Sequence, residues 1–396
     1  MSEWKKVKLG ELCDFINGGA WSDKEYAPEG IPVLKVTNCK NSGFSLSELS
    51  YLPYSLEQKY IQNKLQRNDV IIATVGSHPN LVHSSAGRSV IVNSFVEGFY
   101  LNQNAVCIRT KDEEILDQLF WGYYSKYYLF QNYIQMRGKG AANQMRIAIS
   151  AIKNYPMPLP PINVQRHIAS ILSRYDSLIE NYQKQIKLLE EAARRLYKEW
   201  FIDLRFPGHE NTKIVDGVPE GWEKKKVDSI YNIKYGKNLS TKLITDTGLY
   251  PVYGANGVIG YYDKANCNEQ VVLITSRGNG SGDVLKTYHK DAFITNNSFI
   301  VTPLEGFEYC KLPFTFQFLT MANFRAVRTG AAQPQLTNQS IHTVDVVLPD
   351  EKLIEKFCSA TIGMNDTIIK YREQLRLLTE ARDRLLPKLM SGEITV

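Results

Sequence analysis

A duplication at about half the chain length constrains the fold more than any other feature of this sequence. Residues 159–196 align without a gap with residues 348–385, at an offset of 189 positions, and twelve of the aligned residues are identical. In the first copy these include Leu159, Pro160, Tyr182, Gln185, Leu188, Leu189, Glu191, Ala192, Arg195 and Leu196. Repetition of this kind indicates an architecture built from two similar units.

Each copy is preceded by a longer region whose parts also correspond, more weakly and with gaps. The matching strings, in chain order, are WKKVKLGEL and WEKKKVDSI, VIIATVG and VVLITSRG, YLNQNAV and FITNNSF, and RGKGAANQM and RTGAAQPQL. The sequence therefore predicts four segments with an internal pseudo-two-fold repeat. These are a first module at 1–158, a long helix at 159–207, a second module at 208–346 and a second long helix at 347–396.

The two duplicated segments carry the heptad pattern of a coiled coil. Apolar residues recur at alternating steps of three and four over about four heptads. The expected seam residues are Ile168, Leu172, Ile179, Tyr182, Ile186, Leu189 and Leu196 in the first helix and Ile368, Tyr371, Leu375, Leu378 and Leu385 in the second. Since the first helix leads to the second module and the second leaves it, we expect an antiparallel spacer. The alternative, core helices of one globular domain, is disfavoured by the duplication.

Local signals predict where these helices begin and end. Pro161 suits a first helical turn, and Pro207 with the following glycine should end the first helix. Asp350 is a candidate N-cap of the second helix. Pro387 should kink that helix or end it early, because proline lacks the amide hydrogen that the helix needs.

The modules are expected to be rich in β-structure, which makes the fold class α+β. Short runs such as VIIATV and VVLITS are separated by turn strings such as GANG and RGNGSG. A shorter helix with a wide aromatic face is predicted at 112–135. Its counterpart, LPFTFQFLTMANF, has a less regular pattern.

Composition excludes several classes of protein. The start of the chain has no signal-peptide layout, and its longest apolar runs are too short to span a bilayer. The six cysteines are scattered without a C-x-x-C pair, so we expect reduced core residues in a cytoplasmic protein. The net charge of +6, from 47 basic and 41 acidic residues, permits nucleic-acid binding without demanding it.

Two turn-rich stretches at matching positions, 136–146 and 324–336, are the strongest candidates for contacts with DNA. Each combines arginine or lysine, which binds phosphate or guanine, with asparagine or glutamine, which pairs with adenine. With nearby turn residues, the candidate DNA-binding set is Ser77, His78, Arg88, Arg137, Lys139, Asn143, Gln144, Arg146, Tyr253, Asn256, Arg277, Asn279, Arg325, Arg328, Gln333 and Gln335. The alternative is that both stretches are ordinary polar surface loops.

Catalytic motifs are absent from the sequence. It has neither of the NPPY or DPPY strings that a DNA methyltransferase needs, and GNGSG at 278–282 lacks the GK[ST] of a phosphate loop, so we interpret it as a tight turn. Asp216, Glu223 and Lys225 have a loose nuclease-like spacing in a turn-rich segment, and we do not expect a metal site there. His78 and His83 have no evident third ligand, so a surface or DNA-facing position is expected.

The alternating layout resembles the specificity subunit of Type I restriction-modification enzymes. Besides the repeat, the strings GLYPVYGANGVIGYY, TSRGNGSG, GAAQPQL and KLMSGEI carry the resemblance, which covers nearly the whole chain; the first copy departs from it with GAANQM. The resemblance implies two target-recognition domains that each read half of a split double-stranded DNA site. It also implies a non-catalytic chain that docks two modification subunits and works with ATP-dependent restriction subunits. S-adenosylmethionine, magnesium and ATP would then bind to the partner subunits.

Two other classes of function stay open from the sequence alone. One is a catalytic DNA enzyme whose active site lacks a familiar motif. The other is a scaffold whose modules bind protein, although such a scaffold has no need for Arg-Gly and Gln-Asn loops in both copies.

Overall fold

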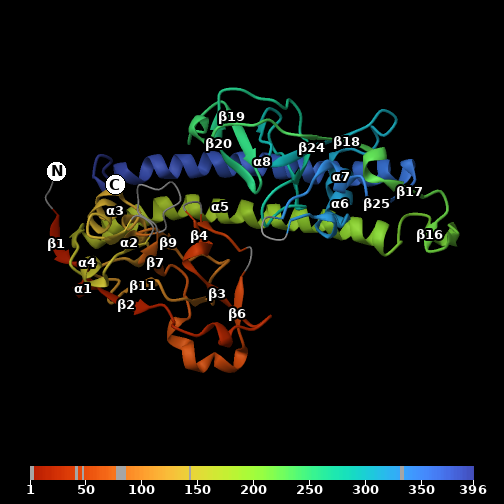
Figure 1. Cartoon of the computed structure of the whole chain (residues 1–396). Helices are drawn as coiled ribbons and strands as arrows, with labels where there is room; N and C mark the ends of the chain where they lie inside the picture. Colours follow the sequence, from red (N-terminus) through yellow and green to blue (C-terminus); the bar gives the residue numbers. More distant parts are fainter. Residues whose placement is uncertain (1–3, 41–42, 47–48, 77–85, 142–143, 331–333) are drawn as a thin grey trace. The chain divides into compact units, whose positions relative to one another are not determined.

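The computed structural model describes residues 4–40, 43–46, 49–76, 86–141, 144–330 and 334–396. The chain forms two compact units, Met1–Tyr182 with Gln374–Val396, and Gln183–Glu373. Two long helices, α5 (Ile162–Tyr197) and α8 (Glu351–Met390), each contribute one part to both units (Figure 1). Each unit thus contains one β-rich module and a part of each helix, which confirms the predicted α+β fold.

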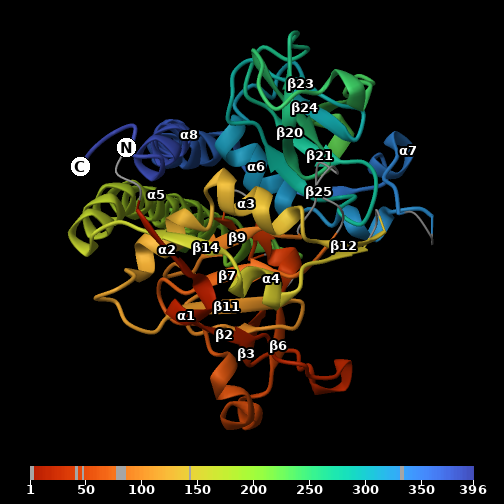
Figure 2. The same ribbon diagram turned by 90° about the vertical axis from the view of Figure 1, so that its left-hand side faces the viewer.

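The first module is built around a four-stranded antiparallel sheet in the order β2-β11-β7-β9 (Figure 2). Smaller sheets have the orders β10-β3-β6, β12-β13-β8, β1-β14 and β4-β5. The strands are β1 (Lys5–Lys8), β2 (Cys13–Asn17), β3 (Ile31–Leu34), β4 (Cys39–Lys40), β5 (Gly43–Phe44), β6 (Ser50–Leu52), β7 (Val70–Ala73), β8 (Val75–Gly76), β9 (Ser89–Ile91), β10 (Tyr100–Leu101), β11 (Ala105–Thr110), β12 (Lys139–Ala141), β13 (Gln144–Arg146) and β14 (Pro156–Leu159). The short helices are α1 (Leu9–Leu12), α2 (Gln118–Tyr124), α3 (Tyr128–Gln135) and α4 (Ile149–Lys153).

The second module repeats the two largest sheets and the terminal two-stranded sheet of this plan. Its sheets have the orders β18-β24-β21-β22, β20-β19-β23, β17-β25 and β15-β16, and β19 pairs in parallel with β23 as β3 does with β10. The strands are β15 (Ile214–Val215), β16 (Val218–Pro219), β17 (Glu223–Lys226), β18 (Tyr231–Tyr235), β19 (Tyr250–Gly254), β20 (Gly257–Tyr262), β21 (Val272–Thr275), β22 (Val284–Lys286), β23 (Phe293–Ile294), β24 (Ser298–Pro303) and β25 (Asp345–Leu348). The short helices are α6 (Leu312–Met321) and α7 (Asn338–Ile341).

The two long helices complete the core of each module. In the first unit, Ile168 and Leu172 of α5 and Leu389 of α8 belong to the same buried cluster as Trp121. In the second unit, Tyr197 and Phe357 join the cluster of Phe314 and Phe299 in the same way. Burying such side chains stabilises a fold by about 1.5–3 kcal/mol each, so neither module has a closed core without both helices.

The helices run antiparallel within each unit. In the first unit, Arg382 of α8 donates to Asp176 of α5 at 2.6 Å, while Leu172, four residues earlier, packs in the cluster that contains Leu386. In the second unit, Arg372 donates to Glu190 at 3.1 Å and Phe357 packs against Tyr197 with ring centroids 5.8 Å apart. Residue numbers thus fall along α8 as they rise along α5, as the sequence predicts.

The predicted seam residues are all buried or half-buried. The buried ones are Ile168, Leu172, Ile186 and Ile368, and the half-buried ones are Ile179, Tyr182, Leu189, Leu196, Tyr371, Leu375, Leu378 and Leu385. Arg382 interrupts the apolar pattern, and its ion pair with Asp176 explains why: the side chain is 14% exposed and its charge is neutralised there. The exposures are those that a buried helix face requires, and the heptad seam itself stays a prediction.

The helix ends differ from two of the predictions. α5 ends at Tyr197 and continues as a π-helical turn, Lys198–Ile202, so it stops before Pro207. α8 does not end at Pro387 but runs on to Met390, because a proline in the last turn costs only one helical hydrogen bond. The predicted cap is confirmed: the Asp350 carboxylate accepts from the amide of Leu353 at 3.3 Å.

The single helix expected at 112–135 is two helices, α2 and α3. The chain turns between them because the Ser125 hydroxyl donates to the carbonyl of Gly122 at 2.6 Å and Tyr127 has an extended backbone. The break lets both helices place rings around Tyr155, which contacts Tyr124 and Phe130. The counterpart in the second module, expected within LPFTFQFLTMANF, is the continuous ten-residue helix α6.

Two expectations from composition can be compared with the structure. All six cysteines are buried and none forms a disulfide. Within the residues that the structure describes, no helix is both long enough and apolar enough to cross a lipid bilayer.

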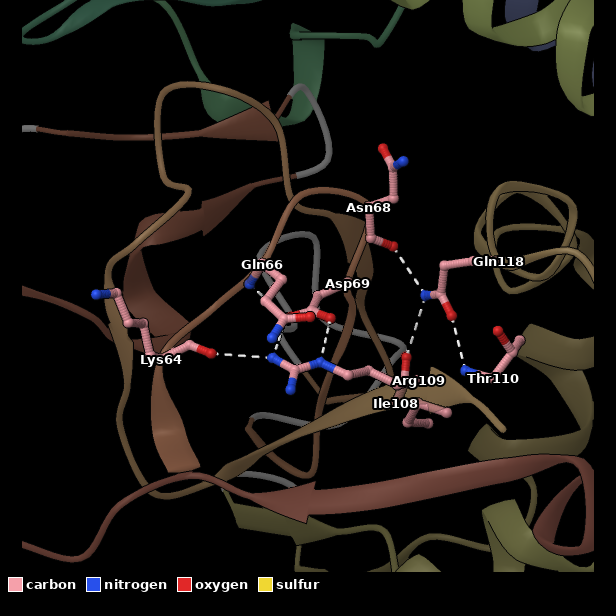
Figure 3. Close-up of polar contacts among 8 residues, drawn as sticks. All are labelled: Lys64, Gln66, Asn68, Asp69, Ile108, Arg109, Thr110 and Gln118. Carbon is pink, nitrogen blue, oxygen red and sulfur yellow. Dashed lines mark hydrogen bonds and ion pairs between the residues drawn. The ribbon is translucent and has the colours of Figure 1, made fainter. Parts of the chain in front are cut away.

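An ion pair fixes the entry of the chain into β7 (Figure 3). Asp69, 3% exposed at its side chain, accepts from Nε of Arg109 on β11 at 2.6 Å and from the amide of Gln66 at 2.7 Å. A second arginine nitrogen reaches the carbonyl of Lys64 at 2.9 Å. Gln118 of α2 adds three hydrogen bonds to the backbone on both sides of the pair. The network thus joins the segment before β7 to β11 and α2.

We predict that Arg109→Met lowers the free energy of unfolding by about 3 kcal/mol, because it leaves the buried Asp69 carboxylate without its counter-ion. Lys59→Met is the control: Lys59 pairs with Glu25 at 2.8 Å but is 57% exposed, so solvent screens the pair and its loss should cost much less. Urea denaturation followed by circular dichroism measures both. Equal losses for the two variants would show that burial of the Asp69 pair does not matter.

A buried lysine joins the second module to α8. Lys286 is 9% exposed, and its Nζ donates to Oδ1 of Asn365 at 2.9 Å. The aromatic rings of Tyr288 and Phe316 also lie within 6 Å of the ammonium, and the charges of Glu190 and Arg372 act on it with opposite signs. Burial lowers the pKa of Lys286 to about 8.

The pKa of Lys286 is lower in the folded state than in the unfolded one. Below about pH 8 the amine is charged in both states, and its burial destabilises the fold. Between about pH 8 and 10.5 the folded state loses this proton first, so the free energy of unfolding rises with pH. We predict that the stability difference, Lys286→Met minus wild type, falls between pH 8 and 9.5 by up to about 1.4 kcal/mol per pH unit. Cysteines and tyrosines titrate in both proteins, so their effect cancels in the difference between the two free energies of unfolding. Urea denaturation across pH 7–9.5 tests this, and a constant difference would contradict it.

Candidate nucleic-acid interface

Three segments of the second module form a small platform of exposed polar residues, here called platform 2. They are the β19–β20 turn around Asn256, the turn 275–283 and, from the stretch 323–336, the described residues 323–330 and 334–336. Arg277 and Thr329 each form an antiparallel bridge with Gln335, so the three residues lie in one row across the backbone. The amide of Gly278 also donates to the carbonyl of Pro334 at 3.0 Å, which ties the first turn to the last stretch.

Buried side chains hold platform 2 on the module. Phe324 and Leu336 are at most 1% exposed and belong to the main core of this unit. Gly282 has a φ of +87°, and a Cβ there would lie 3.1 Å from the backbone of Phe324 and Arg325. The close approach requires glycine and brings the turn 275–283 directly onto the start of the 323–336 stretch.

Backbone carbonyls orient Arg328, and the carboxylate of Asp283 orients Arg325. Arg328 donates to the carbonyls of Arg325 at 3.0 Å and Asn279 at 3.3 Å. Arg325 donates through Nε to Asp283 at 2.9 Å. Arg277, Asn279 and Gln335 are exposed. The platform therefore presents fixed donors and amide groups to the solvent.

The first module carries an equivalent platform, here called platform 1. Its backbone is the three-stranded sheet β12-β13-β8, in which Arg146 pairs with Lys139 on one side and Val75 on the other. Arg146 is exposed, whereas its neighbours Met145 and Ile147 are 2% and 3% exposed. This alternation points Arg146 away from the core.

Matching backbone hydrogen bonds show that the two platforms have the same frame. The amide of Thr74 donates to Asn104 as that of Ser276 does to Asn297, each at 2.8 Å. The carbonyl of Thr74 accepts from Ile147, and that of Ser276 from Leu336, again at 2.8 Å each. Counting along the chain from these bonds, Val75 corresponds to Arg277, Arg146 to Gln335 and Lys139 to Thr329.

The remaining candidate residues have mixed environments. Arg88 points inward and donates to the carbonyl of Cys39, and burial lowers its pKa. Arg137 lies over the ring of Tyr133, 3.5 Å from its centre. Asn256 is exposed, with its side-chain oxygen beside Gly280. Ser77, His78, His83, Asn143 and Gln333 lie outside the described residues, and Gln144 is part of β13.

The structure argues against Tyr253 as a DNA-binding residue, and it shows the surroundings of Glu223 and of the GNGSG turn. Tyr253 is 3% exposed, and its hydroxyl accepts from the amide of Tyr288 at 3.0 Å, so it supports the module from inside and does not face DNA. Glu223, part of the nuclease-like spacing, forms an ion pair with Lys225 at 2.6 Å. GNGSG forms the tight turn that the sequence predicts, and the strand β22 follows it.

The candidate set predicted from the sequence does not contain Val75 and Thr329, which lie beside Arg146 and Gln335. Neither residue type suggests DNA binding alone, and only their place beside Arg146 and Gln335 marks them. The pairing of the strands in VIIATVG and RTGAAQPQL identifies these two positions. The sequence repeat alone does not reveal this pairing.

Comparisons with known proteins agree with this architecture. Residues 1–191 and 219–374 match the family described as Type I restriction modification DNA specificity domain. The putative type I restriction enzyme MjaX specificity subunit of Methanocaldococcus jannaschii is 25% identical, over 100% of this chain and 94% of the relative. The MjaIX specificity subunit of the same organism is 26% identical, over 62% of each protein.

A solved structure shows the same fold. The S subunit of a Type-I restriction-modification system from M. genitalium is 22% identical, with a TM-score of 0.55 over 98% of this chain and 96% of that one. Because the family match takes in both modules and most of both long helices, the chain belongs to the Type I restriction modification DNA specificity family.

Proposed function

We propose that this chain is the DNA-recognition subunit of a Type I restriction-modification complex. It reads a split, asymmetric double-stranded target, one half through each module, and it works in the cytoplasm. Methyl transfer and ATP-driven cleavage belong to modification and restriction subunits, which bind S-adenosylmethionine, magnesium and ATP. The chain itself is a recognition component, in keeping with its family.

The observation that carries this proposal is that one backbone frame appears twice with different side chains. Recognition of a base edge needs donors and acceptors held in fixed positions, and both platforms are anchored by core residues. Because the two platforms share one backbone arrangement, both can dock on duplex DNA in the same way. Because their side chains differ, they should read different bases. A target with two unlike halves follows from that arrangement.

Mapping of methylated sites in cells that express this chain with its modification subunit tests the proposal. We expect one bipartite motif with two unlike halves. Replacing residues 1–158 by the first module of another family member should change one half and leave the other intact. A continuous motif, or a change of both halves, would contradict one-module-one-half recognition.

A repeated surface on the long helices supports docking of two copies of one partner. Three of the identities between the copies lie at steps of four and three on an exposed face: Leu188, Ala192 and Arg195 in α5, and Leu377, Ala381 and Arg384 in α8. The leucines are 66% and 44% exposed, and the arginines 74% and 78%. The heptad seam does not require these residues, and a partner helix with apolar and acidic residues would fit them.

We predict that Leu188→Glu and Leu377→Glu each remove one bound modification subunit, and that the double variant removes both. Leu178→Glu is the matched control, because Leu178 is also exposed, at 47%, but its repeat counterpart is Thr367. Native mass spectrometry of the assembled complex counts the subunits. Two bound subunits in the double variant would contradict the docking surface.

A further inference from the structure

The two platforms contain corresponding rows of three side chains, and we infer that these rows select the bases of the two half-sites. The rows are Val75, Arg146 and Lys139 in the first module and Arg277, Gln335 and Thr329 in the second. This inference rests on the proposed function and adds to it which positions read, which residues correspond, and which bases each row favours.

Geometry places each row on one face of its platform. Residues directly opposite each other in adjacent strands point to the same side, with strands about 4.8 Å apart. Val75, Arg146 and Lys139 are opposite one another in this sense, so the row extends over roughly 10 Å. The major groove of DNA is about 12 Å wide and admits a narrow β-ribbon, so a row of this length fits within it.

The anchoring of the middle residue makes each row rigid. Arg146 lies between Met145 and Ile147, both buried in or against the core, and Gln335 is followed by the buried Leu336. Gln335 also exchanges two backbone hydrogen bonds of 2.9 Å with Thr329. A side chain on a fixed backbone loses less conformational entropy on binding, which favours a specific contact.

The chemistry of the two rows differs in a way that predicts base preference. Arg146 and Lys139 offer only donors, which match the two acceptors of guanine in the major groove, and Val75 suits contact with a thymine methyl group. In the second row, Arg277 again matches guanine, whereas the amide of Gln335 both donates and accepts, as adenine requires. The first half-site should thus favour guanine at the middle read position, and the second adenine.

The stretch of chain between the outer and the middle residue differs in length by one residue between the two rows. Seven steps along the chain separate Lys139 from Arg146, and six separate Thr329 from Gln335. Both pairs nevertheless stand directly opposite each other. Exchange of the three side chains therefore does not require exchange of the loops.

The test is a graft in the complete complex with its modification subunits. Val75→Arg, Lys139→Thr and Arg146→Gln are introduced together, and bound sequences are selected from DNA with randomised half-sites. We expect the first half-site to change to the base preferences of the second at the read positions, by about tenfold or more, with the second unchanged. Lys24→Thr, an exposed lysine outside the platform, is the control for lost charge.

A reciprocal single variant covers the case in which the graft disturbs folding. Gln335→Arg should convert the adenine preference of the second half-site to guanine and leave the first half-site alone. If this variant keeps the wild-type preference, or if a folded graft keeps the original first half-site, the rows do not select bases. If the wild-type complex itself selects no sequence, the proposed function has failed, which is a different result.

Discussion

The structure depends on burial of apolar side chains from two antiparallel helices in the cores of two modules. Ile168 and Leu389 close the first core, and Tyr197 and Phe357 close the second. The same helices therefore provide both the predicted coiled-coil seam and part of each module core. A change in their register would disturb both modules. This shared use explains why the helical segments have kept more identities than the modules, whose exposed side chains are free to differ.

Equivalent helix positions hold the two modules by different chemistry. Asp176 and Asn365 are separated by the 189-residue offset of the duplication, and each contacts its own module. Asp176 accepts from Tyr123 at 2.7 Å and neutralises Arg382, whereas Asn365 accepts from the buried ammonium of Lys286. The frame has thus persisted after the duplication while its polar contacts have diverged, as the platforms have.

The sequence predicted the helices well and the platforms less well, for physical reasons. Heptad spacing depends on residues close in the chain, so the seam through Ile168 and Ile368 could be recognised without tertiary information. Burial of Tyr253 and the break at Ser125 depend on distant packing, which periodicity does not report. The correspondence of Arg146 with Gln335 was hidden by the one-residue difference in loop length, and only strand pairing reveals it.

In the proposed complex, each module contacts its own half of one DNA target. Site-specific crosslinking tests this most directly, with a photoreactive residue at position 146 or at position 335 of the complex bound to its full target. We expect position 146 to crosslink to one half-site and position 335 to the other. Crosslinks from both positions to the same half, or from neither to DNA, would contradict this expectation.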